Sequence, residues 1–101
     1  MIFTFILIDK PDSAELRTRL RPIHKAYLAQ VADRMAFAGP LTTEDGNTVL
    51  GSLIAIDFPS RADVDAWLKD EPYTKAGVYE KPIIHVFNNM WEQKAGFPPA
   101  K

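Results

Sequence analysis

The sequence predicts a single α+β domain whose strands and helices follow the order β-α-β-β-α-β. Two observations lead to this prediction. Four runs rich in β-branched and aromatic residues have the length of strands, and two segments between them repeat apolar residues every three or four positions. The chain of 101 residues suits one domain. We expect this domain to occupy residues 1–92, with residues 93–101 as a polar, proline-rich C-terminal tail.

The first strand and the first helix are expected at the start of the chain. Residues 2–9 form the strand, and both of its faces are apolar, as in the middle of a covered sheet. Asp12 and Glu15 then mark a helix start of the capping-box type. Pro22 lacks a backbone N–H, so we expect a kink or break there that opens a second helical segment. The expected apolar stripe of this helix is Leu16, Leu20, Ile23, Tyr27 and Val31.

The middle of the chain predicts a hairpin followed by a helix. Residues 34–40 are expected to form a strand, residues 44–47 carry an Asp-Gly turn signal, and residues 49–58 form the next strand. Ser60 is the expected N-cap of the second helix, with Asp63 at the capping-box position. The expected buried stripe of this helix is Val64, Trp67 and Leu68. Pro72 is expected to end the helix.

The last strand, expected over residues 82–91, completes a four-stranded antiparallel sheet of the ferredoxin-like type. Two helices can cover only one face of such a sheet. The first strand is nevertheless apolar on both faces, so the second face also needs a cover. We therefore expect a homodimer whose sheets pack face to face and close into an α+β barrel.

Composition and charge exclude several classes of protein. The 12 basic and 13 acidic side chains give a net charge of -1, whereas general nucleic-acid binding needs a basic face. The chain has no cysteine, which excludes disulfides and thiolate chemistry. The apolar N-terminus lacks the features of a signal peptide and is too short to span a membrane. We expect a cytoplasmic protein with neither nucleic-acid nor membrane partners.

No motif predicts a metal or a cofactor. The two histidines, His24 and His85, lie on different predicted elements, with no partner at ligand spacing. His85 lies in mid-strand within an apolar run, where a hydrogen-bonded core or interface histidine is the better interpretation. Residues 46–52 have glycines at phosphate-loop spacing, but they lack the lysine and lead into a strand. A hairpin turn explains them better.

His24 is the candidate for acid–base chemistry. It lies at the edge of the apolar stripe, where it can reach a cleft between helix and sheet, although position alone more often indicates a surface residue. Residues 70–80 form the expected exit loop of the second helix, a rigid platform for a polar side chain. Asp70 and Glu71 gain nothing from the dipole at that helix end, which favours another role over simple solvation. A carboxylate beside an imidazole fixes its tautomer and stabilises the imidazolium.

Three cationic residues, Arg17, Arg21 and Lys25, recur every four positions along the first helix. For Arg17 and Lys25 we expect a solvated helix face. For Arg21 two interpretations stay open: the same solvated face, or a local positive field that attracts an anionic ligand.

Four short motifs occur in order along residues 1–90. They are Arg21-Pro22-x-His24, Ala38-Gly39-Pro40, Gly51-Ser52 and Glu71-Pro72-Tyr73-x-x-Ala76-Gly77-Val78-Tyr79. In this ordered set the chain resembles the YciI-like (YCII-related) family of small dimeric α+β-barrel proteins. The resemblance implies a ferredoxin-like fold, a sheet-to-sheet dimer and an active site built on a His–Asp pair.

The resemblance also implies which residues form that pair. The histidine falls on His24, and the acid falls on Glu71, where glutamate replaces the family's aspartate. Glutamate is one methylene longer, so the neighbouring Asp70 is an alternative partner. The resemblance implies a site more than a reaction.

The leading hypothesis is a cofactor-free acid/base pocket for a small anionic or cyclic metabolite. His24 acts as general acid/base and Glu71 orients it, which suits isomerisation or elimination on a cyclic or unsaturated acid. The alternative is a non-catalytic dimer that binds a metabolite or a protein, and a third reading is a cofactor-free monooxygenase. The remaining expected pocket residues are Arg21 for an anionic group, Ser52 for a hydroxyl, and Tyr73 and Phe37 for the apolar part.

Overall fold

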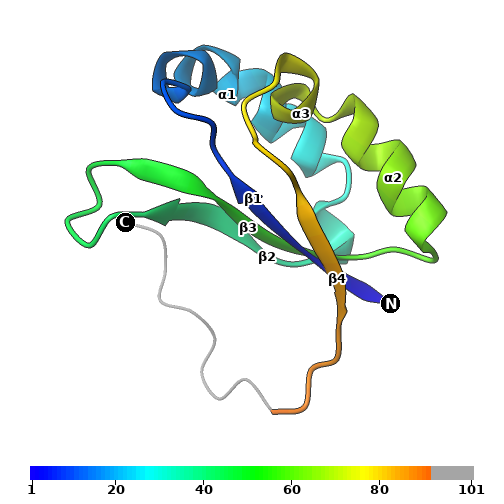
Figure 1. The fold of residues 1–101 in the computed structure, drawn as a ribbon. Coiled ribbons are helices and arrows are strands. Elements are labelled where there is room, and N and C mark those ends of the chain that lie inside the picture. Colours follow the sequence, from blue (N-terminus) through cyan, green and yellow to red (C-terminus); the bar gives the residue numbers. More distant parts are fainter. Residues whose placement is uncertain (92–101) are drawn as a thin grey trace.

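The computed structural model describes residues 1–91 (Figure 1). The expected order of strands and long helices is confirmed, with a 3₁₀ helix added before the second strand and a short α-helix added after the second long helix. The part of the tail expected over residues 93–101 lies outside the described residues. The elements are β1 (Ile2–Ile8), α1 (Ala14–Ala29), a 3₁₀ helix (Ala32–Arg34), β2 (Met35–Thr42), β3 (Val49–Asp57), α2 (Arg61–Asp70), α3 (Pro72–Ala76) and β4 (Ile83–Phe87).

The four strands form one sheet in the order β2-β3-β1-β4, and every neighbouring pair is antiparallel. This order confirms the predicted ferredoxin-like α+β fold and places β1 in the interior of the sheet. Figure 1 shows α1, α2 and α3 on the same side of the sheet. Within residues 1–91, no helix covers the opposite face.

The hydrophobic core lies between the sheet and the helices. On β1, Phe3, Phe5 and Leu7 face the helices and are 2%, 0% and 1% exposed. The alternate residues of β1 face the open side, where Ile8 is 41% exposed. Both faces of β1 are therefore apolar, as predicted, but only one is covered. The other core residues include Ile54, Ile56, Val64, Leu68 and Tyr73.

The inward face of α1 differs from the predicted stripe: Leu28 packs against the core, Val31 lies beyond the helix, and Ile23 is exposed. Ile23 was expected in the core but is 59% exposed. The inward face passes from Leu20 to His24, a step of four residues, and so leaves Ile23 on the outside. A histidine therefore occupies a position that the helical repeat would otherwise give to an apolar residue.

The start and the middle of α1 also correct the prediction. The N-cap is Ser13 rather than Asp12, and the Ser13 hydroxyl donates to the Val78 carbonyl at 3.4 Å. Helix α1 runs through Pro22 without a break. The carbonyl that Pro22 leaves without a helical partner belongs to Thr18, which is exposed, so water can bond to it.

The segment after α2 is a helix rather than the expected loop. Ser60 caps α2 as predicted, because its hydroxyl oxygen accepts from the Asp63 amide at 3.3 Å. Helix α2 ends at Asp70, and Pro72 then opens α3 as a first-turn residue, where its missing N–H costs nothing. Strand β4 is shorter than expected, since it ends at Phe87 rather than at residue 91.

Candidate active site

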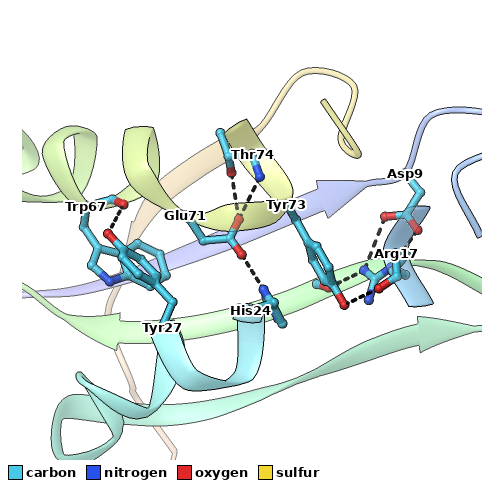
Figure 2. Close-up of polar contacts among 9 residues, drawn as sticks. Asp9, Arg17, His24, Tyr27, Trp67, Glu71, Tyr73 and Thr74 are labelled. Carbon is cyan, nitrogen blue, oxygen red and sulfur yellow. Dashed lines mark hydrogen bonds and ion pairs between the residues drawn. The ribbon is translucent and has the colours of Figure 1, made fainter. Parts of the chain in front are cut away.

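The structure brings His24 of α1 and Glu71 together, although 47 positions separate them in the chain (Figure 2). The Nδ1 atom of His24 is hydrogen-bonded to Oε1 of Glu71. The side chains are 12% and 2% exposed, respectively. Asp70, the alternative acid, is exposed and forms no ion pair among the described residues. The carboxylate that meets His24 is therefore that of Glu71.

Glu71 is held in place because it is also the N-cap of α3. Its second carboxylate oxygen, Oε2, accepts hydrogen bonds from the Thr74 amide at 2.8 Å and the Thr74 hydroxyl at 3.1 Å. Pro72 starts the helix and Gly77, with φ 79°, ends it in the left-handed conformation that glycine adopts without strain. The local sequence thus fixes the orientation of the carboxylate.

Tyr73 forms the wall beside this pair. Its ring stacks on the His24 ring with centroids 3.8 Å apart and planes at 10°. Its hydroxyl donates to the Arg17 carbonyl at 3.0 Å. Burial raises the pKa of the Tyr73 hydroxyl despite the opposing charges of Arg17 and Arg21, so this phenol stays neutral at neutral pH.

A second polar cluster, which the sequence analysis missed, joins Asp9, Arg17 and Ser52. Arg17 Nε donates to Asp9 Oδ2 at 2.8 Å, and its Nη2 donates to Asp9 Oδ1 at 3.3 Å and to Ser52 Oγ at 2.7 Å. The prediction of a solvated face for Arg17 is wrong, since the Arg17 and Asp9 side chains are only 13% and 9% exposed. Burial alone lowers the pKa of Arg17, but Asp9 outweighs that effect and raises it overall. The guanidinium is therefore a permanent cation.

Backbone packing positions Ser52 for this contact. Ser52 pairs with Leu7 in the sheet and takes a place on the buried face of β3 that would otherwise suit an apolar residue. The preceding Gly51 allows β3 to approach β1, because a Cβ there would lie 2.1 Å from the Leu7 carbonyl oxygen. A polar residue on an otherwise apolar strand face was the signal available in the sequence.

These groups meet at a cleft of about 410 Å³ between α1 and the strands β2 and β3. One end is lined by cationic and hydroxyl side chains together with Pro40 and Val49 of the strands, and no carboxylate is among the lining residues. The other end is apolar. His24 lies between the two ends. The residues that line the cleft include Arg17, Arg21, His24, Lys25, Ser52, Tyr73, Leu28, Ala29, Ala32, Met35, Ala38 and Ile54.

Most of the expected pocket residues meet at this cleft. Arg21, His24, Ser52 and Tyr73 line it, and Glu71 lies directly behind His24. Phe37 does not line it, which corrects the prediction. The sheet register pairs Phe37 with Ala55 and Ala38 with Ile54, so Ala38 faces the cleft and Phe37 lies on the opposite face.

Two other features of the described chain bear on function. Residues 1–91 contain no group of three or more histidine or acidic side chains arranged to hold a metal ion. Within the same residues, no helix has the length and apolarity needed to cross a membrane.

The family comparison matches nearly the whole chain. The family model of the YCII-related domain matches residues 1–88. Protein YciI of Escherichia coli O6:H1 is 34% identical over 98 residues, covering 90% of this chain and all of that protein. An uncharacterized protein of Haemophilus influenzae is 28% identical with the same coverage.

Solved structures share the fold of this chain. The 5-chloro-2-hydroxyhydroquinone dehydrochlorinase of Burkholderia phenoliruptrix, solved in complex with 2,5-dihydroxybenzoquinone, superposes with a TM-score of 0.81 and 26% identity. The match covers 87% of this chain and 94% of the dehydrochlorinase. An antibiotic biosynthesis monooxygenase shares the fold at a TM-score of 0.53 and 12% identity, covering 89% of this chain and 99% of its own. From the family model and the identity to YciI, the chain belongs to the YCII-related (YciI-like) family.

Proposed function

We propose that the protein is a cofactor-free enzyme that catalyses proton transfer, as in isomerisation or elimination, on a small cyclic or unsaturated anion. One observation carries this proposal: a histidine that lines a cleft is bound through Nδ1 to a buried carboxylate. The dehydrochlorinase that shares the fold is an enzyme of the elimination type, which supports the same reaction class.

The roles of the pair follow from its hydrogen bonds. Because the Glu71 carboxylate only accepts, neutral His24 carries its proton on Nδ1 and has a free lone pair on Nε2. Nε2 has no hydrogen-bond partner among residues 1–91, so it is available to a substrate in the cleft. When Nε2 takes a proton, the charge of Glu71 stabilises the imidazolium.

The second cluster supplies the complementary group. Proton removal next to a carbonyl or hydroxyl places negative charge on a substrate oxygen. Arg17 Nη1, which has no hydrogen-bond partner within residues 1–91, and the Ser52 hydroxyl are the donors at the cationic end of the same cleft, and Asp9 holds the guanidinium in one orientation. Fixed donors of this kind stabilise a developing oxyanion without reorganisation. Arg21, which also lines the cleft, attracts the anionic part of the substrate.

We propose in addition that the working form is a homodimer. The uncovered face of the sheet presents apolar side chains, with Ile8, Ile83 and Phe87 41%, 45% and 44% exposed. Contiguous exposed apolar surface of this kind marks an interface. A second copy of the same chain is the cover that the fold and the family resemblance favour.

The test of the enzymatic proposal is product analysis on a panel of small cyclic acids, lactones and chlorinated hydroquinones, including chloride release from 5-chloro-2-hydroxyhydroquinone. We expect turnover of at least one compound, and we expect His24→Ala to lower it by roughly 10²–10⁴-fold. Ligand binding without conversion of any compound would instead identify a binding module. Turnover that survives His24→Ala unchanged would refute the role of His24.

A further inference from the structure

We propose that the substrate is elongated, with an anionic head at the cationic end of the cleft and an apolar extension that lies along its other end. This inference rests on the proposed function, because it adds a substrate class to the same site. We call the apolar end the wing and define it by Leu28, Ala29, Ala32 and Met35.

The first argument is size and position. The cleft measures about 410 Å³, within the range that holds drug-sized ligands rather than the smallest metabolites. The groups with chemistry, His24, Arg17 and Ser52, occupy one part of it. Helix α1 advances about 1.5 Å per residue, so the wing continues for roughly 7–8 Å from His24 to Ala29 and then on to Ala32. That space serves no step of the proposed chemistry.

The second argument is the construction of the wing. Leu28 and Met35 pack against the hydrophobic core, so its walls are supported from behind. Ala29 and Ala32 are small, and their side chains leave the volume between these walls open. The wing has no charged or hydrogen-bonding side chain among its four residues, which favours an apolar occupant.

The third argument is the charge at the other end. Asp9 neutralises Arg17, and Glu71 faces His24. Arg21 and Lys25 also line the cleft, but neither forms an ion pair within the described part of the chain. An amphipathic anion therefore has one favourable orientation, with its charge near Arg21 and its apolar part in the wing. Ala29 and Ala32 then set the length that the site accepts.

The experiment uses straight-chain carboxylates as probes: butanoate, hexanoate, octanoate and decanoate, with dissociation constants measured by calorimetry. We expect each added methylene to tighten binding roughly two- to fourfold until the wing is filled. Ala29→Phe fills the wing, so we expect it to abolish this gain and weaken decanoate at least tenfold while leaving butanoate unchanged. Ala26→Phe is the matched control, because Ala26 is exposed on the same helix and does not line the cleft.

Each outcome decides the proposal. Affinity that does not depend on chain length overturns it, as does an Ala29→Phe effect that is equal for all lengths or is reproduced by Ala26→Phe. A change of oligomeric state in Ala29→Phe overturns it too, because the wing would then be a contact between copies. The proposed acid–base function is tested by a separate measurement, which is the loss of turnover in His24→Ala.

Arg21→Ala should lower the affinity for all four carboxylates by the same factor, because each of them places its charge near Arg21.

Discussion

At the scale of single residues, Glu71 decides how His24 behaves. Glu71→Gln keeps the size of the side chain but removes the negative charge that faces the His24 ring. We expect a loss of turnover of roughly 10²-fold. Glu71→Ala should also release the ring, and nitrogen-15 NMR of the imidazole measures this directly. In the wild type we expect protonation on Nδ1, and in Glu71→Ala a mixture of tautomers. A wild-type ring protonated on Nε2 would contradict this assignment.

Asp9 has its own prediction at the same scale. Asp9→Ala leaves the mostly buried Arg17 guanidinium without its ion pair, and a change of this kind costs about 3 kcal/mol of unfolding free energy. The matched control is Asp65→Ala, which breaks the surface pair between Arg61 and Asp65, whose side chains are 55% and 61% exposed. We expect that loss to stay below about 0.5 kcal/mol. Equal effects in urea denaturation would show that the Asp9 pair does not stabilise the fold.

At the scale of elements, the short helix α3 depends on its C-terminal glycine. Gly77 has φ 79°, and a Cβ there would meet only the Lys10 amino group at 3.6 Å, an ordinary contact. The cost of Gly77→Ala is therefore backbone strain alone, about 1 kcal/mol. Gly77→Asn should cost less, because asparagine tolerates the left-handed region better. Thermal unfolding of both variants measures the difference, and a larger loss for asparagine would contradict the argument.

The sequence predicts elements well where local signals decide them. The Ser60 cap, the Asp45-Gly46 turn and the strands of the sheet all follow from short patterns, and all are present. Helix α1 shows the limit. Spacings of three and four residues are both helical, so the pattern could not distinguish Ile23 from His24 as the inward residue. The packing of α1 against the sheet determines which of these two residues faces inward.

The residues of the candidate site likewise fall into those that the sequence could predict and those that it could not. His24 and Glu71 could be paired in advance because a family motif carries each of them. The burial of Arg17 could not be predicted, because it depends on Asp9, directly after β1, and on Ser52 of β3. Phe37 was misplaced because its side of the sheet depends on the pairing register of β2, which has an irregularity between Met35 and Phe37.

At the scale of the whole molecule, the open face of the sheet predicts assembly. We expect sedimentation to give the mass of two chains, and we expect Ile83→Asp to give the mass of one, because it places a charge on the uncovered face. Val86→Asp is the control: Val86 is 50% exposed on the same strand but pairs with Phe3, whose side chain faces the helices. A wild type with the mass of a single chain would refute the dimer.

The tyrosines predict how the whole fold responds to alkaline pH. Burial raises the pKa of Tyr79 above its usual value, and burial likewise raises the pKa of Tyr27 and Tyr73. In the unfolded chain these hydroxyls lose protons near pH 10 while the folded protein retains them. The contribution of these tyrosines to the free energy of unfolding should therefore be fully present below that pH and be lost as pH rises above it. Tyr79→Phe should make the fall shallower in denaturation series from pH 8 to 11, and an unchanged slope would contradict this.

In the proposed mechanism, the shared carboxylate of Glu71 links local folding to turnover. One oxygen caps the first turn of α3 and the other is bonded to His24, so unfolding of that turn removes the contacts that fix the carboxylate beside the imidazole. Deuterium exchange at the Thr74 amide therefore reports the same opening that disables the base. On gentle warming, heat inactivation should begin together with faster exchange at Thr74, while the amides of β1 are still protected. Under the proposed mechanism, activity should therefore be lost on warming before the fold is lost.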